Sequence, residues 1–151
     1  MTGARQRPAE PAVGPLVRRG LLQRRRLTQR WIVAAAAAGA AAAHVPVIAP
    51  HLDEAPYMGV LFIVLTVACA VLAIGVLVRD STAVYALAVV TCGLAVIGYA
   101  ATRLVAFPML ADDVGNWLEP LGVVSVVTET IVAVTSLSAL RSKARRVRQP
   151  Q

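Results

Sequence analysis

Four long runs of apolar residues, separated by short polar segments, dominate this chain. They cover residues 31–48, 57–78, 82–105 and 121–140. Each run is close to the ~20 residues that a helix needs to cross the hydrocarbon core of a bilayer. Because lipid offers no partner for a free backbone amide, each run has to close its own hydrogen bonds as a helix. The pattern predicts an all-α, four-helix transmembrane bundle, flanked by tails at residues 1–30 and 141–151.

The composition agrees with this prediction. The chain of 151 residues is 58% hydrophobic and 15% charged, whereas soluble domains are nearer one half and one quarter. A soluble globular enzyme and a disulfide-stapled secreted domain are therefore excluded. The two cysteines, Cys69 and Cys92, fall in the middle of apolar runs, where we expect them to act as small packing residues. A link of three residues, 79–81, makes the second and third runs antiparallel neighbours.

The basic residues predict the direction of the chain in the membrane. The net charge is +7, eight arginines precede Trp31, Arg79 lies between the second and third runs, and five basic residues follow Leu140. The other two connections carry only Arg103, at a helix margin, and hold most of the acids: Asp53, Glu54, Asp112, Asp113 and Glu119. The positive-inside rule then places both termini in the cytoplasm of a multi-pass plasma-membrane protein.

Residues 1–30 contain three prolines and many arginines, which predicts a flexible basic tail. Such a tail either serves only to set the topology or binds anionic lipid headgroups, at about 1 kcal/mol per basic residue. No aromatic residues alternate with the basic ones, so nucleic-acid binding is not expected. As an alternative, the sequence Arg18-Arg19-Gly20-Leu21-Leu22 is similar to a twin-arginine export signal, with cleavage after Ala43.

Glu129 is the most informative polar residue. It lies eight residues into the fourth run, about 12 Å below its outer end. An ionisable side chain at such a depth costs roughly 2.5–3.5 kcal/mol on insertion scales, so it usually faces the bundle interior and has a function. One helical face, by the spacing of three and four, carries the polar residues of this run: Ser125, Thr128, Glu129, Thr135 and Ser136, interrupted by Val132.

Other polar residues fall at a similar depth. His44 lies near the outer end of the first run, His51 and Glu54 follow in the predicted loop, and Arg103 lies near the outer end of the third run. We predict a pocket on the outer side in which the metal ligands are His44, His51, Glu54 and Glu129, with Arg103, Tyr99, Ser125 and Thr128 around them. Imidazole and carboxylate groups suit a divalent transition metal such as Zn, Mn, Fe or Cu(II). The same groups can bind a proton.

Each of these residues also has a structural interpretation. Glu129 would pair with Arg103 and so fix the helix packing, and His44 would bind a backbone carbonyl near Pro46. Asp53 would cap the second helix. His51 and Glu54 would then be solvated loop residues.

A longer pattern extends over most of the chain after residue 40. It comprises His51-x2-Glu54-x-Pro56-x3-Val60-x-Phe62, Arg103-x4-Pro108, Glu119-Pro120-x-Gly122 and Glu129. In these positions the chain resembles the uncharacterised small four-helix integral membrane proteins of actinobacterial type. The resemblance implies the fold and singles out the same polar residues, but it implies no activity. Segment 102–108 departs from the group, because it reads Thr-Arg-Leu-Val-Ala-Phe-Pro where the group has Ser-Arg-Thr-x-Gly-Leu-Pro.

Two functions follow from these observations. The first is a small membrane protein whose His/Glu pocket binds a metal ion or a proton, in metal handling, sensing or accessory transport. The second is a non-catalytic subunit that packs against a larger membrane protein or a second copy, favoured by the short connections and by the Ala-rich first run, in which Ala35, Gly39 and Ala43 form one ridge. An enzymatic role has the least support, because only Glu129 and His44 could form an acid–base pair. The two isolated cysteines exclude a quinone-linked thiol oxidase, and the absence of an acid from the first run excludes a small multidrug exporter.

Overall fold

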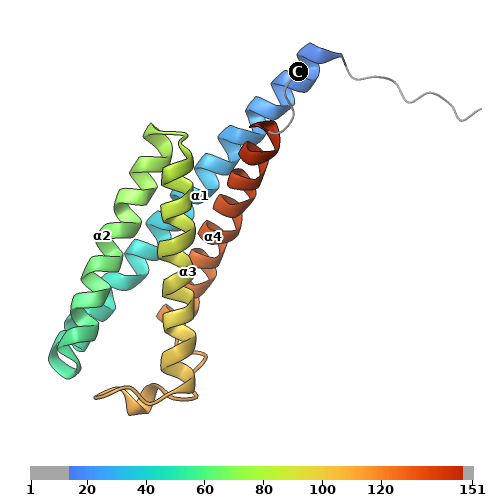
Figure 1. The fold of residues 1–151 in the computed structure, drawn as a ribbon. Coiled ribbons are helices and arrows are strands. Elements are labelled where there is room, and N and C mark those ends of the chain that lie inside the picture. The colour runs from blue at the N-terminus through green and yellow to red at the C-terminus, as the bar shows by residue number, and fades with distance from the viewer. Residues whose placement is uncertain (1–13, 148–151) are drawn as a thin grey trace, which may run out of the picture.

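The computed structural model describes residues 14–147. Within this range it contains four long helices, α1 (Pro15–Glu54), α2 (Pro56–Val78), α3 (Thr82–Leu104) and α4 (Pro120–Val147), and one short 3-10 helix, η1 (Ala111–Asp113) (Figure 1). All four long helices are long and apolar enough to cross a membrane. The described part of the chain has no β-strand, only an isolated bridge between Phe107 and Leu110. The predicted all-α, four-helix bundle is confirmed.

The helices are not packed evenly. Helix α1 packs against α2 and α4, and α4 also packs against α3, whereas the contact between α2 and α3 is much smaller. In Figure 1, α2 and α3 lie together at the 79–81 link and diverge toward the opposite end of the bundle. This divergence leaves room between two helices that are consecutive in the sequence.

Three element boundaries differ from the prediction: both ends of α1, and the C-terminal end of α4, which continues through residues 141–147 of the predicted tail. Residues 15–30, which we expected to belong to a flexible tail, form the first part of α1, while residues 1–13 and 148–151 of the predicted tails lie outside the described range. Helix α1 also continues past Pro46 and Pro50 to Glu54. Proline is tolerated inside membrane helices because neighbouring groups satisfy the freed carbonyls. His51 and Glu54 therefore lie on the last turns of a helix and not in a loop.

The core is built from small side chains, which let the helices approach closely. Val33, Ala37 and Ala40 of α1 are fully buried with Cys69 of α2 and Cys92 of α3. Both cysteines are free thiols. From the predicted small-residue ridge, Gly39 faces α4: a Cβ atom added there would lie 3.4 Å from Cγ2 of Thr128.

Basic side chains connect the helices on the side of the bundle where the first and the last described residues both lie (Figure 1). The Arg30 guanidinium donates hydrogen bonds to the backbone carbonyls of Val76, at 2.9 Å, and of Leu77, and so caps the C-terminus of α2. In the 79–81 link, the Asp80 carboxylate lies 2.7 Å from Nζ of Lys143 and 3.8 Å from Arg26. Arg26 and Lys143 therefore hold α1 and α4 against the link. This is a packing role, in addition to the effect of their charge on the orientation of the chain in the membrane.

The Asp80 contacts predict a pH-dependent stability. Burial alone would raise the pKa of this carboxyl, but the hydrogen bond and charge of Lys143, together with Tyr85 and Arg26, hold the pKa below its ordinary value. The folded state therefore gains stability above the unfolded pKa of about 3.9, and loses it as the pH falls through the lower folded value. Because Asp80 is partly exposed, we expect Asp80→Asn to cost at most about 1 kcal/mol at neutral pH.

Unfolding of the detergent-solubilised protein, followed over a pH range, checks this prediction. The difference between wild type and Asp80→Asn should shrink toward zero in acid, while the exposed Asp112→Asn control should track wild type throughout. A difference that stayed constant down to the lowest pH would show that the ion pair does not account for it.

Candidate functional site: a buried His–Glu pair beside a cavity

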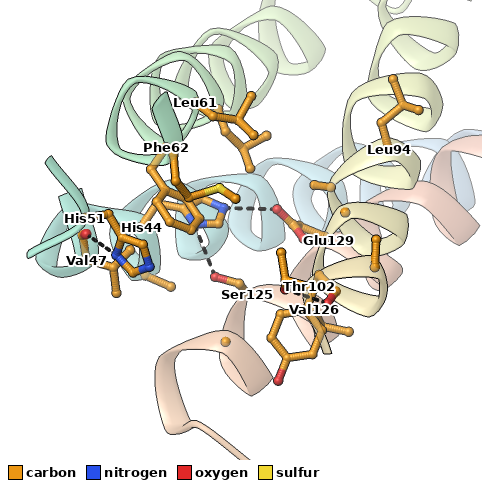
Figure 2. Close-up of a pocket in the computed structure, with 18 of the residues that line it drawn as sticks. His44, Val47, His51, Leu61, Phe62, Leu94, Thr102, Ser125, Val126 and Glu129 are labelled. Atoms are coloured by element: carbon orange, nitrogen blue, oxygen red, sulfur yellow. Dashed lines mark hydrogen bonds and ion pairs between the residues drawn. The ribbon is translucent and has the colours of Figure 1, made fainter. Parts of the chain in front are cut away.

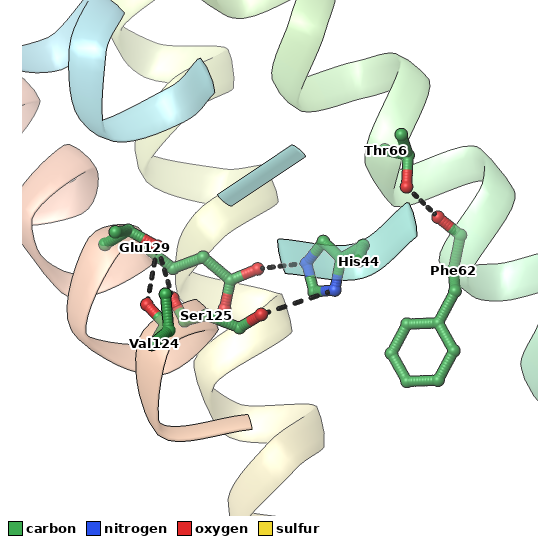
Figure 3. A network of polar contacts seen from close by, with 7 residues as sticks. His44, Phe62, Thr66, Val124, Ser125 and Glu129 are labelled. Carbon is green, nitrogen blue, oxygen red and sulfur yellow. Dashed lines mark hydrogen bonds and ion pairs between the residues drawn. The ribbon is translucent and has the colours of Figure 1, made fainter. Parts of the chain in front are cut away.

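Glu129 of α4 and His44 of α1 form a buried pair. His44 Nε2 lies 3.0 Å from Oε1 of Glu129, and the two residues are 4% and 1% exposed. Figure 3 shows the imidazole pointing directly at the carboxylate. The predicted polar face of α4 does face the interior, since Ser125, Glu129 and Ser136 are all buried whereas Val127 and Val134 are exposed. The structure therefore joins the two residues that the sequence placed at one depth, 85 positions apart.

Ser125 completes the environment of the imidazole. It lies one turn before Glu129 on α4, and its Oγ is 3.4 Å from Nδ1 of His44 (Figures 2 and 3). A hydroxyl group can either donate or accept a hydrogen bond. With a neutral imidazole, Nε2–H donates to Glu129 and Ser125 donates to Nδ1. With an imidazolium, Nδ1–H donates to Ser125 instead. Both protonation states of His44 are thus satisfied without movement of the backbone.

The predicted metal site does not assemble as a set of four ligands. Among residues 14–147, no group of three or more His, Cys, Asp or Glu side chains is placed to hold a metal ion. Phe62 of α2 separates the two histidines: its ring stacks on His44 with centroids 5.5 Å apart and meets the edge of His51 at 4.8 Å. His51 Nδ1 is bound to the carbonyl of Val47 at 2.8 Å. Glu54 is exposed and lies outside the cavity lining.

Arg103 has a different partner from the one considered in the sequence. Its NH1 lies 2.6 Å from a carboxylate oxygen of Asp113 and donates to the Asp113 carbonyl at 3.2 Å. Its guanidinium lies over the ring of Tyr99, 4.6 Å from the centroid. The loop after α3 folds back, with Gly115 N bound to the carbonyl of Arg103 at 3.0 Å. This return of the loop brings Asp113 next to Arg103. Glu129 therefore pairs with His44 and not with Arg103.

The other predicted residues support the site rather than form it. The Tyr99 hydroxyl donates to the carbonyl of Trp117 at 2.9 Å, which anchors the loop before α4. The Thr128 hydroxyl donates to the carbonyls of Val124 and Ser125 in its own helix and not to the pair. Asp53 does not cap α2, whose N-cap residue is Ala55 with no side-chain hydrogen bond.

The sequence analysis missed two residues of the site. Phe62 was noted only within the resemblance, although it is the one aromatic side chain of its run after Tyr57, a signal that it packs on another ring. Glu119 was named only among the acids of a connection and within the resemblance, but its carboxylate accepts hydrogen bonds from the amides of Leu121 at 3.1 Å and Gly122 at 2.5 Å. Its position directly before Pro120, which starts a helix, was the available sign of a cap.

A cavity of about 680 Å³ adjoins the pair and extends between the diverging parts of α2 and α3 (Figure 2). Most of its walls are apolar, and its polar lining includes His44, His51, Thr91, Tyr99, Thr102, Arg103, Asp113, Glu119, Ser125 and Glu129. The volume lies within the range of about 300–1,000 Å³ that is typical of small-molecule sites. The pair is therefore buried from bulk solvent but borders a space that a small molecule can fill.

No family model, curated protein or solved structure matches this chain. Any inference about function therefore depends on the residues of the site.

Proposed function

We propose that this protein is a small polytopic membrane protein that binds and releases a proton at the His44–Glu129 pair. The observation that supports this most directly is the complete hydrogen bonding of His44, whose two ring nitrogens face Glu129 and Ser125 at 3.0 and 3.4 Å. A purely structural pair needs a partner for one protonation state only. This site has partners for both states.

Because the surroundings of the pair are of low polarity, the number of protons that it binds strongly affects its energy. An imidazolium–carboxylate pair and a neutral imidazole–carboxylic acid pair both carry no net charge, whereas loss of one proton leaves a buried negative charge. Burial of an unpaired charge is costly, so proton release is coupled to any change that admits water or a ligand to the cavity. The positive-inside rule predicts that the cavity end of the bundle lies on the outer side, so the proton would exchange with the outer medium.

The metal version of the function has weaker support. His44 and Glu129 supply one nitrogen and one oxygen, and Ser125 could add a hydroxyl. A typical transition-metal site has at least three protein ligands, and His51 is turned to its own helix. Metal binding would thus require a displacement of Phe62 that proton binding does not require.

Infrared difference spectroscopy of the protein in lipid nanodiscs tests the proton proposal. Stepping the outer pH should change the imidazole and carboxyl bands of the pair in wild type; Glu129→Gln should remove the carboxyl part of this change, and His44→Gln should move it to a different midpoint. Ser125→Ala should move the midpoint as well, whereas Ser136→Ala, the matched buried serine on α4, should not. Identical spectra for wild type and Glu129→Gln would overturn the proposal. A stoichiometric metal in purified wild type that both pair variants lose would favour the metal version instead.

A further inference from the structure

The cavity opens sideways toward the lipid. Leu61 and Val64 of α2 and Val90 and Leu94 of α3 all line it, yet these four side chains are 54–63% exposed on the outer surface of the bundle. Leu61 and Leu94 mark the two helices that border this opening in Figure 2. A molecule dissolved in the membrane can therefore reach the cavity between α2 and α3 without passing through water.

Arg103, at the polar end of the cavity, has one hydrogen-bond donor without a partner. Nε of Arg103 is buried and has no hydrogen-bond partner among residues 14–147, and Arg103 as a whole is only 7% exposed. A buried donor without a partner is rare, because it pays the full cost of desolvation. Since other atoms of Arg103 line the cavity, a turn of its side chain would bring this donor to an acceptor oxygen on a bound molecule.

The charges of the lining select against an anionic head group. Arg103 is the only lysine or arginine among the described residues that line the cavity, and its charge is already balanced by Asp113 at 2.6 Å. The remaining ionisable lining residues are acids, histidines and Tyr99. A phosphate or carboxylate would therefore enter without a free cation beside it, which is unfavourable at low polarity. A neutral head with a carbonyl or hydroxyl oxygen fits this lining.

The polar end of the cavity favours a small molecule with a polar head over a helix of a partner protein. A helix would bring apolar side chains against Arg103, so its Nε donor would stay without a partner.

We propose that this cavity binds a neutral, membrane-dissolved amphiphile with a carbonyl or hydroxyl oxygen on its head. Its apolar chain lies between α2 and α3, and its head oxygen accepts from Nε of Arg103, within the same cavity that borders the His44–Glu129 pair. The proposal depends on the cavity walls and on Arg103, and it does not require that the pair exchange a proton.

Photolabelling in nanodiscs tests this proposal with three alkyl diazirine probes that share one chain and end in a methyl ketone, a hydroxyl or a phosphate. The ketone and hydroxyl probes should label peptides from α2 and α3 that line the cavity, and the phosphate probe should label them at least about tenfold less. Leu94→Trp should fill the opening and lower the labelling by the ketone probe by a similar factor. Ile97→Trp is the matched control, since Ile97 is as exposed on α3 (65%) but lies outside the lining.

Equal labelling by the phosphate probe, or an equal loss in both tryptophan variants, would overturn the proposal, as would labelling only of peptides outside the cavity. Crosslinks between two copies at the α2–α3 opening that exclude the probes would identify a second chain as the occupant, which also contradicts it. The proton proposal can be tested independently of this one. Leu94→Trp should retain the pH-dependent infrared band, because it leaves Glu129 and His44 unchanged.

Discussion

Replacement of Glu129 by alanine is expected to destabilise the bundle by about 3–5 kcal/mol, the range found when one partner of a buried ion pair is removed. The variant leaves Nε2 of His44 without its partner at 3.0 Å, in a position that is only 4% exposed. Glu129→Gln should cost clearly less, because its amide oxygen can still accept from Nε2. Reversible unfolding in mixed detergent, with helical content as the readout, measures both free energies.

A double-mutant cycle separates the pair from its surroundings. If the two side chains stabilise each other, His44→Ala combined with Glu129→Ala should cost less than the sum of the single variants, because the double variant leaves no unpaired member of the pair behind. Ser136→Ala provides the control on the same helix, since the Ser136 hydroxyl has no partner among the described residues and its loss should change stability by less than about 0.5 kcal/mol. Additive costs, or equal costs for alanine and glutamine at position 129, would show that the contact contributes little.

Gly59→Ala is expected to destabilise the protein by about 1–3 kcal/mol, the usual cost of an extra methyl group in a tightly packed site. A single residue, Ala55, separates the end of α1 from the start of α2, so the first turn of α2 lies directly against the last turns of α1. A Cβ atom on Gly59 would lie 2.7 Å from the backbone nitrogen of Leu52 and 2.6 Å from Cγ of its side chain. The side chain could rotate away, but the backbone of a helix cannot, and the hairpin would have to open.

Gly93→Ala is the matched control for this prediction. Gly93 also lies inside a membrane helix, α3, but a Cβ atom added there meets nothing within 4 Å. Alanine forms helices better than glycine, so this variant should be neutral or stabilising in the same unfolding assay. If both alanine variants behaved alike, the close approach of α1 and α2 at Gly59 would not be needed for the fold.

Much of the fold could be predicted because the bilayer restricts what a chain can do. A run of about twenty apolar residues has only one way to satisfy its backbone in lipid, so the positions of α2 and α3 agree with the prediction to within a residue. The same physics predicted which face of α4 is turned toward the other helices. A helix with Ser125 and Glu129 on one side and valines on the other is most stable with the polar side facing protein.

The partners of the polar residues could not be predicted in this way. Depth along a helix brought His44, Arg103 and Glu129 to one level, but depth does not determine which two of the three meet. That choice depended on the loop after α3, which returns Asp113 to Arg103, and on Phe62, which lies between the two histidines. Both are contacts between segments that are distant in the sequence and have no period that a pattern could reveal.

The sequence by itself determined that the chain forms four membrane-length helices with its costly polar groups turned inward, because each of these properties follows from the local exchange of water for lipid. Only the tertiary structure decided that His44 pairs with Glu129, that α2 and α3 diverge around a cavity, and that Arg103 keeps one donor free beside it. These features depend on packing among all four helices, where small differences in side-chain size at Gly59, Gly39 and Phe62 set how closely each pair can approach.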